Sequence, residues 1–274
     1  KDCDIVVAGW IYQLPELKET GKPVFYWEQG HESLFGDLPD PDTAMGIRAS
    51  LNGCYRSGIP IVSVSDFVSR ILKARYDITS PVITNGLDIE KYVPKFQEKK
   101  DDVRILLVGN PYLRFKAFDD AVKALDIVWR NGNRFEVEWV CQAKPSINPS
   151  FPVKYNVLPS EETLISCYQQ ADIFLFTSWY EGFGMPPLEA MACGTPVIMT
   201  NCGGVRAYME KGYNSLIAEP GDIETLARHV ELLIKDEEKR RFIGSNGIKT
   251  AKKFSHHHVI PQLEKYMREL LRNF

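Results

Sequence analysis

The sequence lacks the features that mark several large classes of protein. Its uninterrupted apolar runs are far shorter than the roughly 20 residues that a membrane-spanning helix needs, and its first residues show no signal-peptide pattern. A formal net charge of -3 gives no electrostatic reason to expect a nucleic acid as partner. What remains is a globular composition, 44% hydrophobic and 25% charged over 274 residues, which is long enough for two modest cores.

The cysteines and histidines form no metal-binding pattern. The six cysteines lie far apart without a Cys-x-x-Cys pair, so we expect no zinc site. Several sit in apolar runs, where a reduced cysteine packs as a small hydrophobic residue, which favours a reducing compartment. His256, His257 and His258 would point in different directions on a helix and make a poor site. We therefore expect a cytoplasmic protein without metal, either free or at the inner face of the cell membrane.

Short apolar runs alternate with amphipathic stretches, which predicts βα units and a parallel sheet. Most of the runs lack strict alternation, so both faces of the sheet should be buried. The expected strands are residues 5–8, 24–27, 61–65, 104–108, 136–141, 155–158, 173–177 and 197–200. Helical spacing of apolar residues predicts helices at 117–129, 161–171, 223–234 and 257–271.

The charged segment 90–102, which contains Pro94, predicts a linker between two α/β units. The N-terminal unit then covers residues 1–94 and the C-terminal unit residues 95–255. Residues 256–274 form a final helix that could cross back to the N-terminal unit. The chain opens at Lys1 directly before a strand, which is consistent with a fragment.

The segment 181–189, Glu-Gly-Phe-Gly-Met-Pro-Pro-Leu-Glu, follows a predicted strand and opens a helix. Ligands of parallel α/β sheets bind beyond the carboxyl ends of strands, and amides at a helix start suit phosphate. Glu181 could stabilise the positive charge of an oxocarbenium-like state, and Glu189 could accept both hydroxyls of a ribose. The residues alone leave a structural alternative open, because a glutamate in a first helical turn stabilises it by about 0.3–1 kcal/mol.

Residues 171–178, 181–197 and 203–204 together closely resemble the retaining glycosyltransferases of family 4. Shorter matches lie at 65–68 (Ser-Asp-Phe-Val), 85–88 (Asn-Gly-Leu-Asp), 220–222 (Pro-Gly-Asp) and 254–255 (Phe-Ser). The resemblance implies an α/β protein of the GT-B fold, in which two Rossmann-like parallel-sheet domains face a cleft. It also implies that the N-terminal domain is incomplete here, at about half the usual length and without a Gly-rich first turn.

The resemblance assigns roles to individual residues. Glu181 would sit against the donor sugar and Glu189 would bind the nucleotide ribose, while Lys116 would neutralise the diphosphate. Asn110 stands where the family usually has an arginine, and Arg114 is a candidate to replace it. In the N-terminal unit His31 is a candidate catalytic residue, with Glu32 second. Further donor contacts are expected from Gly109, Gly182, Phe183, Gly184 and Met185, and from the main chain of Val157 or Leu158 towards the base.

The implied activity is transfer of a sugar, with retention of configuration and without metal or cofactor. The donor would be a nucleotide-diphosphate sugar, and the acceptor a glycan, a lipid-linked molecule or a small molecule, as in polysaccharide or glycoconjugate synthesis. Asn110 and the short N-terminal unit also suit a nucleotide-sugar-binding module with little turnover. A dinucleotide-dependent oxidoreductase is disfavoured, because neither Gly9 nor Gly109 begins a Gly-x-Gly-x-x-Gly turn.

Overall fold

The computed structural model describes residues 3–37, 40–95 and 102–274 and divides the chain into two compact units. Unit 1 comprises Lys1–Gly86 and His256–Phe274, and unit 2 comprises Leu87–Ser255. The boundary expected at residue 94 therefore moves to Gly86, and the C-terminal helix is grouped with unit 1 by its contacts. Most of the expected linker, residues 96–101, lies outside the described residues.

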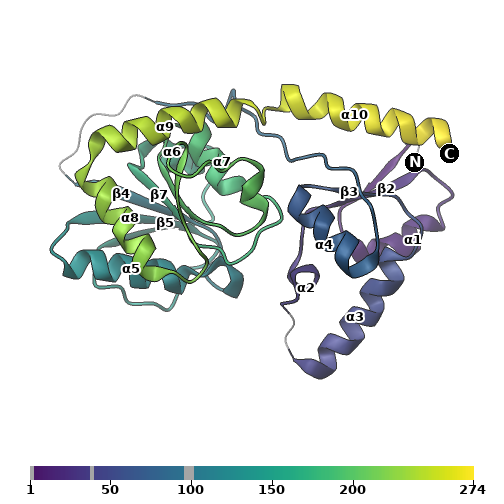
Figure 1. Cartoon of the computed structure of the whole chain (residues 1–274), viewed down its shortest axis with the longest axis horizontal. Coiled ribbons are helices and arrows are strands. Elements are labelled where there is room, and N and C mark those ends of the chain that lie inside the picture. The colour runs from purple at the N-terminus through teal and green to yellow at the C-terminus, as the bar shows by residue number, and fades with distance from the viewer. Residues whose placement is uncertain (1–2, 38–39, 96–101) are drawn as a thin grey trace. The chain divides into compact units, whose positions relative to one another are not determined.

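Unit 1 is built on a parallel three-stranded sheet in the order β1-β2-β3. Its elements are β1 (Val6–Ala8), α1 (Leu14–Lys18), β2 (Val24–Glu28), α2 (Glu32–Phe35), α3 (Pro41–Tyr55), β3 (Ile61–Ser63), α4 (Asp66–Tyr76) and α10 (His256–Asn273). Phe25 and Val62 of the sheet pack against Val259 of α10, and the ring of Tyr266 meets Phe25 edge-on at 5.3 Å. The C-terminal helix thus completes the core of this unit, and Figure 1 shows it alongside β2 and β3.

Unit 2 is a doubly wound α/β domain with a parallel six-stranded sheet in the order β6-β5-β4-β7-β8-β9. Helices α5 and α8 cover one face, and α6, α7 and α9 the other (Figure 1). The strands are β4 (Val103–Val108), β5 (Phe135–Cys141), β6 (Val153–Val157), β7 (Ile173–Phe176), β8 (Val197–Thr200) and β9 (Ser215–Ala218), and the helices are α5 (Phe118–Arg130), α6 (Glu161–Gln170), α7 (Met185–Ala192), α8 (Ile223–Lys235) and α9 (Glu237–Lys252). The buried strands β4 and β7 lie at the centre of the sheet, as their continuous apolar runs predict.

The eight expected strands all form, with ends within two residues of the predicted ones. The sequence did not indicate β9, nor the helices α1 to α4 and α9. Helix α9 carries few apolar residues and two internal glycines, which oppose a helix by propensity. The packing explains both glycines. A Cβ on Gly244 would lie 2.2 Å from the carbonyl oxygen of Gly194, and one on Gly247 would lie 3.2 Å from Cβ of Met191 in α7.

Replacement of Gly244 by alanine should therefore destabilise the protein although alanine favours helices. Alanine contributes about 1 kcal/mol of helix propensity, but the backbone oxygen of Gly194 cannot yield as a flexible side chain would. We expect Gly244→Ala to lower the free energy of unfolding by about 2 kcal/mol, measured by chemical denaturation. Gly53→Ala in α3 is the matched control. A Cβ there meets no atom within 4 Å, so stability should stay or rise, and equal effects at both glycines would contradict the packing argument.

Candidate functional site

The strand order of unit 2 places a candidate site between β4 and β7. The chain leaves β4 towards β5 and β6 on one side and continues from β7 to β8 and β9 on the other. In open parallel sheets, ligands bind beyond the carboxyl ends of the strands at such a switch point. The turn after β4 carries Lys116, and the loop after β7 carries Glu181, so two predicted site residues meet where the topology favours a ligand.

Lys116 and Glu181 form a partly buried ion pair. Nζ of Lys116 lies 2.6 Å from Oε1 of Glu181, and both side chains are less than one-fifth exposed. The hydroxyl of Ser178 donates to the same carboxylate oxygen at 2.8 Å. Nζ of Lys116 also lies 5.0 Å from the ring centroid of Phe115, within the range of a cation–π contact. The pair is thus held in a fixed geometry with a positive and a negative group side by side.

Backbone contacts join the two loops that carry this pair. The amide of Trp179 donates to the carbonyl of Phe115 at 2.7 Å, and the rings of Phe115 and Tyr180 stack at 4.8 Å. The hydroxyl of Thr177 donates to the carbonyls of Lys116 and Ala117 at 3.1 and 3.0 Å. The position of Lys116 is therefore set by β7 as well as by its own turn.

The backbone of Glu181 is held from a third loop, which follows β8. Its amide donates to the carbonyl of Cys202 at 2.8 Å, and its carbonyl accepts from the amide of Gly204 at 2.9 Å. A Cβ on Gly204 would lie 2.3 Å from the carbonyl carbon of Gly182, so only glycine permits this approach. The hydroxyl of Tyr208 donates to the carbonyl of Gly184 and holds the far end of the same loop.

The loop after Glu181 presents backbone amides rather than a full helix start. Pro186 and Pro187 occupy the first turn of α7 and have no N–H, so the amides at this helix start come from Met185 and from the residues before it. The amides of Phe183, Gly184 and Met185 donate to no protein acceptor in the described part of the chain. Gly184 has a φ of 86°, in the left-handed region. Consecutive amides around such a residue form an anion-binding concavity.

Glu189 lies on α7 beyond the first helical turn in which it was expected, because the helix already begins at Met185, and it is bound by a tyrosine. Its Oε2 accepts from the hydroxyl of Tyr168 on α6 at 2.7 Å. Burial raises the pKa of Glu189, and the hydrogen bond from Tyr168 opposes that rise. One carboxylate oxygen is therefore already engaged, in contrast to the expectation that both are free for a ribose.

The turn after β4 contains the three other residues predicted there. Gly109 has a φ of 146°, and a Cβ on it would lie 3.0 Å from the ring of Phe118. Oδ1 of Asn110 accepts from the amide of Tyr112 at 3.0 Å, so this side chain stabilises the turn. Arg114 is exposed, with its guanidinium 5.6 Å from the ring of Trp179. The structure thus keeps Arg114 in the same turn as Lys116 but does not bring it to Glu181.

Val157 and Leu158, the residues predicted to meet a base, lie at the carboxyl end of the edge strand β6. Their side chains are 47% and 72% exposed, and the amide of Leu158 donates to the carbonyl of Cys141 at 2.9 Å. Leu158 has a φ of 48°, in the left-handed region, so the chain turns sharply here. The turn lies at the carboxyl end of β6, and Lys116 and Glu181 follow the carboxyl ends of β4 and β7 in the same parallel sheet.

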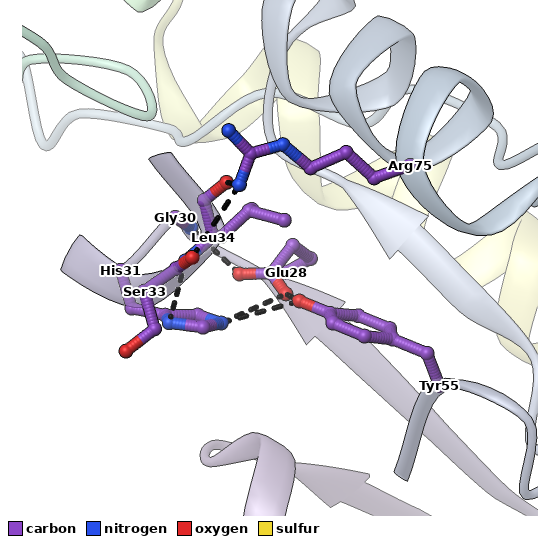
Figure 2. A network of polar contacts seen from close by, with 7 residues as sticks. All are labelled: Glu28, Gly30, His31, Ser33, Leu34, Tyr55 and Arg75. Carbon is purple, nitrogen blue, oxygen red and sulfur yellow. Dashed lines mark hydrogen bonds and ion pairs between the residues drawn. The ribbon is translucent and has the colours of Figure 1, made fainter. Parts of the chain in front are cut away.

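His31 belongs to a buried polar network of unit 1 at the carboxyl end of β2 (Figure 2). Its Nδ1 accepts from the amide of Leu34 and so caps the N-terminus of α2, and its Nε2 lies 3.2 Å from the hydroxyl of Tyr55. Tyr55 donates in turn to Glu28, a fully buried carboxylate that also accepts from the amide of Gly30 at 2.8 Å. Both ring nitrogens of His31 are therefore engaged within the protein, and a catalytic role for its ring would require this network to rearrange.

The sequence missed several residues that shape these sites, chiefly Ser178, Tyr168, Tyr208, Glu28 and Tyr55. Of the loop that holds Glu181 from the other side, the sequence indicated only Gly203 and Gly204, which belong to the resemblance to family 4. A buried tyrosine in an amphipathic helix has the same pattern as any core residue, so Tyr168 could not be distinguished. The described residues contain no group of three or more His, Cys, Asp or Glu side chains that could hold a metal ion. None of the described helices is long and apolar enough to cross a membrane.

The fold and the site define a parallel α/β protein with a paired cation, carboxylate and free amides at its switch point. The chain matches the family described as glycosyl transferases group 1 over residues 154–250. A glycosyltransferase of Methanocaldococcus jannaschii is 36% identical over 220 residues, which cover 77% of this chain and 59% of that protein. O-antigen chain mannosyltransferase B of Escherichia coli is 34% identical over 103 residues, 38% of this chain and 26% of that protein. The chain belongs to the group 1 glycosyltransferases.

Solved structures agree on the fold. Sucrose-phosphate synthase from Thermosynechococcus elongatus superposes with a TM-score of 0.84 at 16% identity, over 99% of this chain and 74% of that one. Anabaena HepE in complex with UDP-glucose superposes with a TM-score of 0.78 at 19% identity, over 97% of this chain and 79% of that one. The fold is GT-B. The aligned regions cover 59% of the Methanocaldococcus relative and 26% of the Escherichia coli relative, which is less than two thirds of either protein. The activity of the whole protein is therefore treated as a proposal.

The network around His31 leads to a prediction about its protonation. Burial lowers the pKa of His31 to about 4. We expect the ring to stay neutral from about pH 8 to about pH 5, with the proton on Nε2, as followed by the nitrogen chemical shifts of the imidazole. Tyr55→Phe should leave the pKa low, because burial is its main cause. Titration of His31 near the ordinary pKa of about 6.5 would show that the ring is open to solvent.

Proposed function

We propose that this protein transfers a sugar from a nucleotide-diphosphate sugar to an acceptor hydroxyl, with retention of configuration and without a metal ion. The observation that carries this proposal is the Lys116–Glu181 pair followed by the amides of Phe183, Gly184 and Met185, which have no acceptor among the described residues. A cation and amides suit a diphosphate, and a carboxylate next to them suits the positive charge that develops on the sugar. This combination serves transfer from a phosphorylated sugar better than binding of an uncharged ligand.

The names of similar proteins support this substrate class. They include an O-antigen mannosyltransferase, a capsular polysaccharide glycosyltransferase of Staphylococcus aureus and a Campylobacter jejuni enzyme acting on a diphospho-undecaprenol. HepE was solved with UDP-glucose. We extend these properties to the present chain as part of the proposal: a glycan or lipid-linked acceptor and a role in polysaccharide or glycoconjugate synthesis, with peripheral contact to the membrane where the acceptor is lipid-linked.

In the proposed reaction the bond between the anomeric carbon and the diphosphate oxygen breaks, and its electron pair leaves with the diphosphate. Lys116 and the amides of residues 183–185 stabilise that negative charge. Glu181 faces the positive charge on the sugar ring, and Glu189 binds the ribose. The acceptor oxygen attacks from the side of the leaving group, and its proton passes to the departing phosphate.

Asn110 and Arg114 bear on the rate of this reaction. Loss of one preorganised charge-stabilising group typically costs ~10²–10³ in rate. The side-chain oxygen of Asn110 accepts a hydrogen bond within the turn, whereas Arg114 is exposed and close to Lys116 in sequence. We propose that Arg114 moves to the diphosphate when the donor binds and compensates for the missing arginine.

A second candidate function is donor binding without turnover. The engagement of Asn110 in its turn favours it. The two functions differ in donor hydrolysis and transfer, which a binding module would lack.

The ribose assignment predicts a loss of nucleotide binding in Glu189→Ala. A thermal-shift screen of nucleotides and nucleotide-sugars first identifies the nucleoside diphosphate that the parent binds. Removal of a carboxylate that accepts a hydrogen bond from a ribose hydroxyl should then lower the affinity for this nucleotide by at least about tenfold, measured by calorimetry. Glu238→Ala, at an exposed position on α9, should bind as the parent does. Unchanged affinity in Glu189→Ala would remove the ribose assignment.

The charge-stabilising role predicts a loss of rate in Lys116→Met. Since the methionine keeps much of the volume but not the charge, we expect donor hydrolysis and transfer to fall by ~10²–10³ while the protein stays folded. Lys116→Arg should retain more of the rate than Lys116→Met. Equal rates for the parent and Lys116→Met would exclude Lys116 from the reaction, and a parent that binds donor but never turns it over would favour the binding module.

A further inference from the structure

A fully buried tyrosine lies directly behind Glu189. Tyr168 on α6 has no exposed surface, and its hydroxyl donates to Oε2 of Glu189 at 2.7 Å. Its carbonyl accepts from the hydroxyl of Thr195 at 2.6 Å, and its ring packs edge-on against Phe174 at 5.6 Å. The ring of Tyr92 lies on another side at 6.2 Å. These contacts hold the ring and the backbone of Tyr168, with its hydroxyl against the carboxylate.

This contact engages only one of the two oxygens of Glu189. Oε2 is engaged by Tyr168, whereas Oε1 has no hydrogen-bond partner among the described residues and is not a buried atom. A free glutamate side chain populates several rotamers and loses that freedom when it binds a ligand. A hydroxyl that holds one oxygen removes much of this cost beforehand, because the other oxygen is then already directed.

We propose that Tyr168 is a positioning residue for nucleotide recognition, whose hydroxyl holds Glu189 so that Oε1 accepts a ribose hydroxyl of the donor. The inference rests on the proposed function, since it takes Glu189 as the ribose ligand. Tyr168 itself does not touch the nucleotide, because it is completely buried. It acts through the geometry and the charge of Glu189. Burial raises the pKa of this carboxyl group, and the bond from Tyr168 counteracts that effect by stabilising the ionised form.

The test compares ribonucleotides with their deoxy counterparts. The affinities of UDP, GDP and ADP for the full chain are measured by calorimetry, followed by the 2′-deoxy and 3′-deoxy forms of whichever nucleotide binds. The parent should prefer the ribonucleotide at the hydroxyl that Glu189 contacts. In Tyr168→Phe we expect the ribonucleotide to bind about tenfold more weakly and the deoxy form to be nearly unaffected, so that the preference falls. Tyr213→Phe, at a partly exposed tyrosine of the same unit, should keep both affinities.

The outcomes separate this inference from the proposed function. If Glu189→Gln abolishes the ribose preference and Tyr168→Phe keeps it, Glu189 is the ligand but Tyr168 does not position it. If Tyr168→Phe lowers the affinities for the ribo and deoxy forms equally, the substitution has caused a general structural defect, and Tyr168 again does not position Glu189. If Glu189→Gln itself keeps the preference, or if the parent binds no nucleotide, the ribose assignment fails and this inference fails with it.

The pH dependence of binding provides a second readout. Glu189 binds a ribose hydroxyl best when ionised, so affinity should be lost as pH falls through its pKa. Loss of the hydrogen bond from Tyr168 leaves the raising effect of burial unopposed. We therefore expect the loss of affinity to begin at a higher pH in Tyr168→Phe than in the parent. Superimposable pH profiles for the two proteins would overturn the proposed role.

Discussion

The site in unit 2 depends on one contact, the ion pair between Lys116 and Glu181. These residues are 65 positions apart and belong to the turns after β4 and β7. The two strands are neighbours because β5 and β6 are added on one side of β4, whereas β7, β8 and β9 are added on the other. A charged pair that is mostly buried is stable only with good geometry and further hydrogen bonds. Ser178 supplies such a bond to the carboxylate, and Thr177 fixes the backbone of Lys116. The loops after β4, β7 and β8 thus supply the hydrogen bonds that this ion pair needs.

The three carboxylates Glu181, Glu189 and Glu28 are held in two ways. Glu181 has a cation as partner, whereas Glu189 and Glu28 each accept from a tyrosine hydroxyl. Burial raises the pKa of the latter two, and in both cases the tyrosine's hydrogen bond favours the ionised form. A neutral donor orients a carboxylate without cancelling its charge. Glu189 therefore keeps its capacity to accept from a ligand, while Glu28, which has no exposed surface, serves the loop that carries Gly30 and His31.

The ends of the strands were predictable because a buried parallel strand is a continuous apolar run between polar or glycine-containing turns. Helix α9 was not, because Gly244 and Gly247 reduce its propensity and are explained only by the close approach of α7 and the turn at Gly194. The same limit applies to the loop after Glu181. The sequence indicates a helix start for phosphate. Pro186 and Pro187 have no N–H, and the amides of this loop that have no acceptor among the described residues belong to residues 183–185.

The sequence by itself determined the α/β class, the two units and the placement of Glu181 and Glu189 on either side of a helix start, because these follow from local periodicity, from proline and glycine chemistry and from resemblance to family 4. The tertiary structure decided the partners: Lys116 for Glu181, Tyr168 for Glu189, and Tyr55 and Leu34 for His31. It also grouped the last helix with unit 1. Such pairings join residues far apart in the chain, and side-chain type alone does not specify which of many buried polar groups will meet.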